Sequence, residues 1–138
     1  MRLSTKSRYG TRMLIDIAEN YHDGPVSVAE IASRTGISEK YMEKLIRRLK
    51  RAGLVLSKRG PKGGHILAKP AGHITVGDVV RALEDWVVLK GCALGKDACA
   101  TCARQSTCPT KDVWEQANEA MFQTLDGYTL QSLLKPGL

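Results

Sequence analysis

The chain has 138 residues, and its formal net charge of +7 is unevenly distributed. Residues 1–66 carry 14 Lys and Arg against 6 Asp and Glu, whereas residues 67–138 carry 7 against 8. A basic excess confined to one half of a chain indicates a polyanionic partner for that half. No apolar run approaches the roughly 18 residues of a membrane span, and the N-terminus lacks the apolar core of a secretory signal. We therefore expect a cytoplasmic protein with no membrane partner, built as one domain with an appendage.

Two predicted helices precede the most basic part of the chain. Apolar residues recur at helical spacing from Ser7 to Tyr21, and the turn residues at 22–25 end this first helix. Ser27 and Glu30 form a capping-box pattern at the start of a second, short helix. Residues 35–37, Thr-Gly-Ile, then have the length of the turn in a helix-turn-helix motif.

The third predicted helix, from Ser38 to Gly53, is amphipathic. Ser38 can cap its start, and Gly53 can end it in a left-handed turn. At about 100° per residue, one face is apolar and the opposite face is cationic. The apolar residues are Met42, Leu45, Ile46 and Leu49, and the cationic residues are Lys40, Lys44, Arg47 and Arg51. An isolated cationic face is usually only solvated, but this one follows a turn of helix-turn-helix length.

A basic hairpin is predicted directly after this helix. The run LVLS at 54–57 and the run HILA at 65–68 enclose the turn RGPKGG, and Lys58, Arg59 and Lys62 repeat the positive charge. A helix-turn-helix followed by a basic hairpin predicts a winged helix that binds duplex DNA. We therefore expect a mainly α fold with a small β-hairpin wing, and a DNA-binding domain over residues 1–84.

The C-terminal part is predicted to contain two further long elements. Thr75 and Asp78 mark the start of another helix, and the chain is helical again from Lys111 to about Asp126. The apolar arc of this last helix needs a partner surface. Packing within its own domain is one option, but we expect residues 111–138 to form a dimerisation helix and tail, because winged-helix regulators read two half-sites through a two-fold axis. The expected interface residues are Val113, Trp114, Ala117 and Met121.

All four cysteines lie in residues 85–110, a stretch too long to remain a structureless loop unless something orders it. Their spacing is C-x6-C-x2-C-x5-C, and the candidate metal ligands are Cys92, Cys99, Cys102 and Cys108. Thiolates bind iron–sulfur clusters, zinc and copper(I). Zinc sites usually pair two short cysteine arms, and only one arm is short here, so the pattern favours iron and sulfide. A metal-free thiol–disulfide sensor remains an alternative.

Several segments together resemble a known family. The opening MRLSTKSRYGTRMLIDIA, the segments GPVSVAEIASRTGIS and YMEKLIRRLKRAGLVLSKRGPKGGH, and the cysteine loop before KDVW are similar to the winged-helix (Rrf-two-type) regulator family of IscR, NsrR, RirA and CymR. The resemblance covers nearly the whole chain. It implies a homodimer in which the recognition helix enters the major groove through Ser38, Lys40, Tyr41, Glu43 and Lys44, while Arg59, beside Gly60, enters the minor groove.

The resemblance also implies a 2Fe–2S or 4Fe–4S cluster held by three loop cysteines and a fourth ligand of varying identity. Cys92 matches the first cysteine position, and Cys102 and Cys108 match the last two. Cys99 is then an additional cysteine, or it replaces Cys102 as the middle ligand. The histidine that IscR-like members use corresponds to Lys111, and the acidic residue of NsrR-like members corresponds to Arg8. Cys99 is therefore our preferred fourth ligand.

The sequence predicts a transcriptional regulator, most simply a repressor, that senses iron–sulfur cluster status, redox state or nitric oxide and binds a near-palindromic operator. A cluster-free regulator of cysteine or sulfur metabolism, acting by thiol oxidation or partner binding, is the alternative. A small iron–sulfur electron carrier is a third reading. No nucleophile–base pair and no carboxylate pair stands out, so we do not expect an enzyme.

Overall fold

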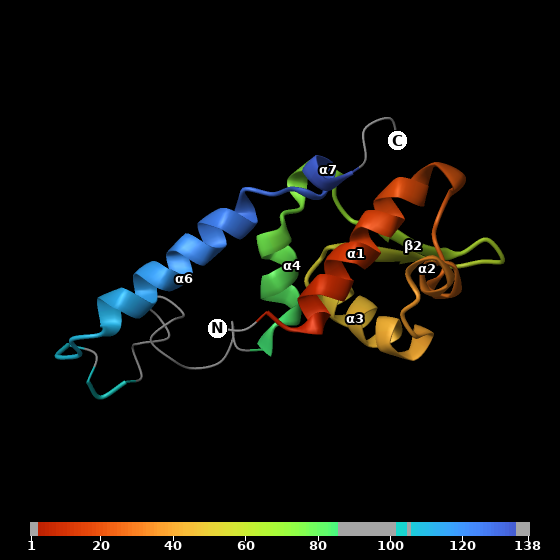
Figure 1. Cartoon of the computed structure of the whole chain (residues 1–138). Helices are drawn as coiled ribbons and strands as arrows, with labels where there is room; N and C mark the ends of the chain where they lie inside the picture. The colour runs from red at the N-terminus through yellow and green to blue at the C-terminus, as the bar shows by residue number, and fades with distance from the viewer. Residues whose placement is uncertain (1–2, 86–101, 105, 135–138) are drawn as a thin grey trace.

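The computed structural model describes residues 3–85, 102–104 and 106–134. Helices dominate these parts of the chain, and a two-stranded hairpin accompanies them (Figure 1). The predicted fold class, a winged helix followed by a long C-terminal helix, is confirmed. No helix in the described ranges is both long and apolar enough to cross a membrane. The elements are α1 (Thr5–Asn20), η1 (Tyr21–Asp23), α2 (Val28–Thr35), α3 (Glu39–Arg51), β1 (Val55–Lys58), β2 (Gly64–Leu67), η2 (Ala71–His73), α4 (Val76–Leu83), α6 (Lys111–Asp126) and α7 (Leu130–Leu133).

The predicted helix caps are present. Ser27 and Thr75 each take part in a complete capping box, and the Ser38 hydroxyl accepts a hydrogen bond from the Tyr41 amide. Each such cap satisfies backbone amides that the first helical turn leaves without partners. These local side-chain bonds explain why α2, α3 and α4 begin where the sequence indicates.

The bounds of the first helix were predicted less well. Helix α1 begins at Thr5, because the Ser4 hydroxyl accepts from the Lys6 amide and caps it two residues earlier than expected. It ends at Asn20, and Tyr21 starts the short turn η1, which the Gly24 amide closes by donating to the Tyr21 carbonyl. The Tyr21 side chain is therefore exposed instead of continuing the buried face.

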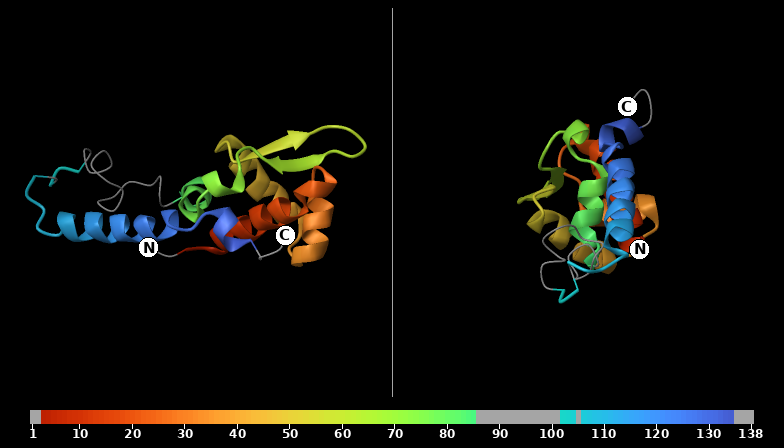
Figure 2. Two further views of the ribbon diagram at one scale, coloured as in Figure 1. Left: turned by 90° about the horizontal axis from the view of Figure 1, so that it is seen from above. Right: turned by 90° about the vertical axis from the view of Figure 1, so that its left-hand side faces the viewer.

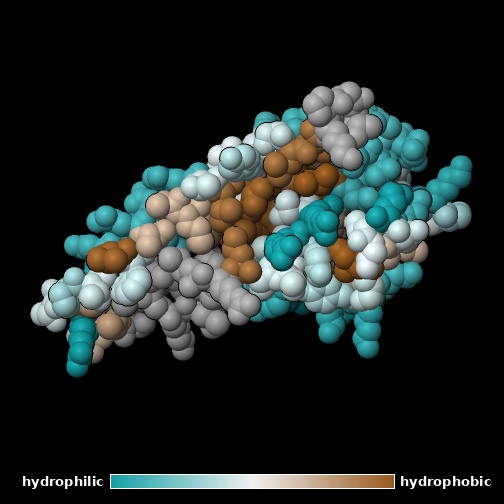
Figure 3. Space-filling view, in the orientation of Figure 1, coloured by the Kyte–Doolittle hydropathy of each residue, from teal (hydrophilic) through white to brown (hydrophobic). Residues whose placement is uncertain are grey.

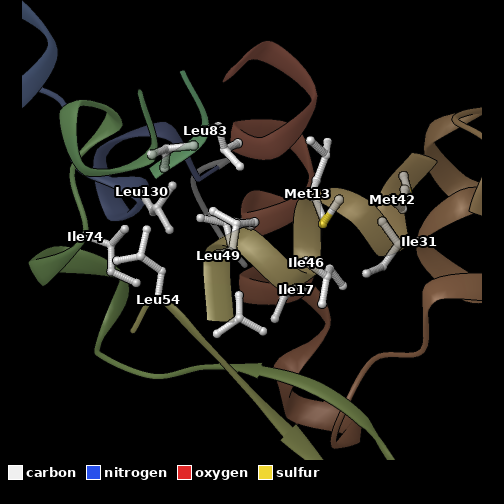
Figure 4. Packing of buried hydrophobic residues seen from close by; sticks show 14 of the residues in the cluster. Met13, Ile17, Ile31, Met42, Ile46, Leu49, Leu54, Ile74, Leu83 and Leu130 are labelled. Atoms are coloured by element: carbon white, nitrogen blue, oxygen red, sulfur yellow. The ribbon is translucent and has the colours of Figure 1, made fainter. Parts of the chain in front are cut away.

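One hydrophobic core joins the N-terminal helices to α4 and α7 (Figure 4). The predicted inner face of α3 is buried throughout, as are Met13, Leu14 and Ile17 of α1. Helices α1 and α4 approach so closely at Gly10 that an added Cβ would lie 2.1 Å from Leu83 Cδ1. This packing fixes the recognition helix against a rigid body, which a protein needs in order to present side chains in one geometry.

The wing is anchored at its base. Strands β1 and β2 pair antiparallel from Val55 with Leu67 to Lys58 with Gly64. Val26, just before α2, extends this pairing with two backbone hydrogen bonds to His65, of 2.9 and 2.8 Å. Gly64 has no room for a side chain, since a Cβ there would lie 2.6 Å from the Val26 carbonyl carbon. A third stretch of chain therefore supports a hairpin that would be marginal alone.

Helix α6 extends away from the winged helix and is attached through its last turn (Figures 1 and 2). Arg81 of α4 donates two hydrogen bonds to the Asp126 carboxylate, of 2.8 and 2.6 Å, and its guanidinium lies 4.2 Å from the centre of the Phe122 ring. The Thr75 hydroxyl donates a third bond to Asp126 at 3.1 Å. The direction of α6 is thus set by contacts of α4 with one end of the helix.

Candidate nucleic-acid interface and cysteine segment

The outer face of α3 presents exposed cations that form no ion pair with the described residues. Lys40, Lys44 and Arg47 are exposed, and none of them forms an ion pair with any residue in the described ranges. Arg48, on the flank of the same helix, instead pairs with Asp85 at 2.7 Å. The exposed face therefore keeps its positive charge available for an external anion, as phosphate contacts require.

The polar residues predicted beside these cations fall into two groups. Ser38 and Glu43 are exposed on the same surface as the lysines. Tyr41 is half-buried, because its ring packs edge-on against Tyr9 with the ring centres 5.9 Å apart. Its hydroxyl also lies 3.5 Å from the Thr5 hydroxyl. The structure thus brings Tyr41 to the contact between α1 and α3, so the phenol fixes the recognition helix as well as bordering its outer face.

The predicted wing residues lie at or beside the tip of the hairpin. Lys58, Arg59, Gly60 and Lys62 are all exposed, and the three cations have no ion-pair partner within the described chain. Gly60 has φ +119°, a conformation that side chains rarely adopt, and so it allows the chain to reverse beside Arg59. The projecting tip therefore repeats the charge of α3 on a separate element (Figure 2).

Two acidic residues that sequence reasoning missed lie at the end of α4. Glu84 is only 3% exposed, and its Oε1 accepts hydrogen bonds from the Ser4 amide and hydroxyl, both 2.9 Å, and from the Ser7 hydroxyl at 2.5 Å. Burial alone would raise the pKa of Glu84, but the hydrogen bonds from Ser7 and Ser4 outweigh it and hold the pKa below its ordinary value. The carboxylate thus fixes the end of α4 to the start of α1.

Asp85 connects three elements. It accepts ion pairs from Arg48 of α3 and Lys6 of α1, both of 2.7 Å. The hydrogen bond from Arg48, followed by that from Lys6, lowers the pKa of Asp85 to about 2. No signal in the sequence could have found this contact, because Lys6 and Asp85 lie 79 residues apart. The chain is therefore held to the recognition helix at the start of the cysteine segment, residues 85–110.

Of the four predicted metal ligands, the structure describes two. Cys102 is exposed and Cys108 is half-buried, and both are free thiols. The Cys108 sulfur lies 3.4 Å from the Thr110 hydroxyl, and this hydrogen bond is the main cause of a lowered pKa of the thiol. Cys92 and Cys99 lie outside the described residues. No group of three potential metal ligands occurs within the described parts, but a thiol that ionises readily is suited to metal binding.

Helix α6 has two different faces. Phe122 points to the body and is 9% exposed, while Val113 is 58% and Trp114 is 48% exposed. Ala117 and Met121 lie half-buried on the arc between these two residues. Apolar surface also runs over the junction of α6, α4 and α7 in Figure 3. Of the predicted interface residues, Val113 and Trp114 are thus the two that are exposed to solvent.

Comparison with known proteins agrees with this architecture. Residues 3–136 match the family described as "Rrf2: Iron-dependent Transcriptional regulator". Protein rrf2 of Nitratidesulfovibrio vulgaris is 47% identical over 135 residues, which is 98% of this chain and 88% of the relative. The structure of T. potens IscR is 39% identical with a TM-score of 0.74, covering 96% of this chain and 85% of that one. The structure of CymR, the global cysteine regulator of B. subtilis, is 34% identical with a TM-score of 0.74, covering 96% and 95%.

Proposed function

Because the chain belongs to the Rrf2 family and is therefore a winged-helix transcriptional regulator, we propose that it represses transcription as a homodimer whose operator affinity depends on the state of its cysteines. Family membership excludes the electron-carrier reading and agrees with the expectation that the chain is not an enzyme. The observation that carries the proposal is the set of exposed cations on α3 and the wing, which have no ion-pair partner in the described part of a chain whose four cysteines follow the helix α4.

DNA recognition is assigned to two surfaces. The exposed face of α3 enters the major groove, where Lys40, Lys44 and Arg47 contact phosphates or base edges and Ser38 and Glu43 supply further polar contacts. Arg59 at the wing tip enters the narrow minor groove, whose negative potential favours arginine. Tyr41 supports this arrangement from the α1 side, since its ring packs on Tyr9.

Dimerisation is assigned to α6. Val113 and Trp114 expose a large apolar surface on a helix that projects from the rest of the chain. A second copy of the same helix would remove this surface from water, which is the usual driving force for association. Two recognition helices related by a two-fold axis would then read a near-palindromic operator.

The cysteine segment is assigned to sensing. An iron–sulfur cluster would be held there by Cys92, Cys102 and Cys108 with Cys99 as the preferred fourth ligand, and it would supply reactivity toward oxidants or nitric oxide. The chain's own residues provide the route to the DNA-binding surface. Asp85 pairs with Arg48 on α3. Binding or loss of a cluster in the adjoining segment would therefore alter a contact of the recognition helix. Lys111 on the far side of the segment starts α6, the proposed dimer helix.

The test is operator affinity with and without the cluster. Protein purified without oxygen is assayed for iron, sulfide and visible absorption, and operator binding is then measured for both forms at one salt concentration, because phosphate contacts depend steeply on salt. We expect the affinities to differ by a factor of roughly 5–150, the usual range of coupling between two sites. Cys102→Ala and Cys108→Ala should abolish the absorption, and Cys99→Ala should alter it. Equal affinities of the two forms would refute cluster sensing.

The similarity to CymR favours a second candidate, in which the thiols act without a cluster. Protein that is colourless and free of iron, but whose operator affinity changes on reversible thiol oxidation, would support this second candidate. Both candidate functions require operator binding by α3 and the wing.

A further inference from the structure

The structure contains a cavity that neither the DNA surface nor the cysteine segment uses. Its volume is about 570 Å³, and it lies half open between the end of α1, the end of β2 and the helix α7. This volume is in the range of small-molecule sites, which are about 300–1,000 Å³. Part of its lining is apolar, including Ala18, Leu67 and Ala71.

Two residues of opposite charge line the cavity, and neither forms an ion pair within the described ranges. Glu19 is half-buried, yet no residue in the described ranges gives it a hydrogen bond or an ion pair. The two buried carboxylates behave differently, because Asp16 pairs with Arg34 and Glu84 accepts from Ser4 and Ser7. An unpaired carboxylate inside a partly enclosed cavity is available to an external cation.

Lys69 supplies the opposite charge. It is exposed, lines the same cavity and forms no ion pair with described residues. Glu19 and Lys69 do not pair with each other, so their charged atoms are more than 4.0 Å apart. A ligand that carries both an ammonium and a carboxylate group complements these two charges.

We propose that this cavity binds a free amino acid with an apolar side chain. The ammonium group lies at Glu19, the carboxylate lies at Lys69, and the side chain packs on the apolar lining. Charge-assisted hydrogen bonds at both ends fix its orientation, and burial of the side chain adds affinity.

Binding there would reach the DNA surface through the wing. Leu67 ends β2, so the cavity touches the base of the wing. On the opposite wall, α7 is connected to the residue before the N-cap of α4 by the hydrogen bond from the Leu130 amide to the Ile74 carbonyl, of 2.9 Å. A ligand would therefore hold the wing and the α7 segment in one relative position. This regulatory part rests on the proposed function, whereas ligand binding itself does not.

The binding test is a titration of the full chain, followed by ¹⁵N–¹H spectra. Valine, leucine, isoleucine, methionine and phenylalanine are the probes, and we expect at least one to shift the amides of residues 18–22, 66–69 and 71 in a saturable way. The amide of that amino acid, which lacks the carboxylate, and the matching carboxylic acid, which lacks the amine, should each bind about tenfold more weakly or worse.

Variants make the test specific. Glu19→Gln and Lys69→Gln should each lower the affinity by about tenfold or more, because each removes one charged partner. Glu119→Gln on the exposed part of α6 is the matched control and should bind like the parent. Absence of a saturable shift with all five probes, or unchanged binding by Glu19→Gln, overturns the site.

The regulatory part has its own readout. Operator affinity is measured with and without the bound amino acid at one salt concentration, and a change that Glu19→Gln abolishes supports it. Unchanged operator affinity of a protein that binds the amino acid overturns regulation and leaves the site. A protein that binds no operator under any condition instead refutes the proposed function, whatever the titration shows.

Discussion

The attachment of α6 to α4 gives the sharpest prediction. Arg81→Met removes the two hydrogen bonds to Asp126 and the guanidinium above Phe122, while it keeps an apolar side chain over the ring. The winged helix itself should stay folded, because the core cluster does not include Arg81. The change therefore loosens the direction of α6 without removing either surface that binds a partner.

The loss of stability expected for Arg81→Met depends on how exposed the Arg81 and Asp126 side chains are. The side chains of Arg81 and Asp126 are 42% and 39% exposed, so water screens the pair, and its contribution is about 0.2–1 kcal/mol. A guanidinium over an aromatic ring at such a site adds about 0.5–1 kcal/mol. We expect Arg81→Met to lower the free energy of unfolding by about 1–2 kcal/mol, or the Tm by roughly 3–6 °C.

The assay is urea unfolding of the parent, Arg81→Met, Asp126→Asn and the double variant. The Arg81 hydrogen bond is the main cause of the lowered pKa of Asp126, so the pair stabilises the folded state above the ordinary pKa of 3.8 and loses this effect as the pH falls below it. The coupling energy of the double-mutant cycle should therefore be about 0.5 kcal/mol at pH 7 and smaller at low pH.

A functional readout separates positioning from stability. In the proposed dimer, the parent should prefer operators whose half-sites lie about 34–36 Å apart, and Arg81→Met should tolerate other spacings more equally. If the variant is less stable but keeps the parent's spacing preference, the α4–α6 contact does not set the angle between the recognition helices and the reasoning is wrong.

Three further predictions concern the other contacts. Arg59→Ala should weaken operator binding by about 1–3 kcal/mol at constant salt, because the wing arginine loses its minor-groove contact; an unchanged affinity would show that the wing does not enter DNA. Trp114→Asp places a charge on the open apolar face of α6 and should give a monomer or an aggregate in sedimentation, and a parent protein that is itself monomeric would refute this interface. Asp85→Asn should destabilise the fold by no more than about 1 kcal/mol at pH 7, since the carboxylate is largely exposed. Because the pKa of Asp85 is lowered, its stabilising effect is complete above pH 3.8 and is lost as the pH falls toward about 2. If the difference in unfolding free energy between the parent and Asp85→Asn stayed constant from pH 5 to pH 2, the ion pairs would be excluded as its cause.

The sequence predicted local features well because their causes are local. Ser27 bonds to a residue three positions away, and so does Thr75. The buried face of α3 follows from helical periodicity alone. The same periodicity shows which residues share a face but not which neighbour lies beside them, so Tyr41 was expected at DNA without its contact to Tyr9.

Contacts between distant parts of the chain escaped prediction for the same reason. Glu84 reads as an ordinary surface acid, and only the folded chain shows that Ser4, 80 residues earlier, donates to it. Phe122 carries no sequence signal that distinguishes it from the exposed apolar residues of α6, although in the folded chain the Arg81 guanidinium lies over its ring. Predictions about Cys92, Cys99 and the bounds of the cysteine domain lie outside the described residues.

The hydrogen bonds between Val26 and His65 have a consequence for how this protein can change over evolution. They hold the hairpin at its base, and the residues from Arg59 to Gly63 lie beyond every such contact. Insertions, deletions and substitutions at the tip therefore leave the core unaltered. Substitutions at the tip can therefore change operator preference without changing the core. Gly64 does not have this freedom, because Val26 lies so close that any larger side chain there would disturb the fold.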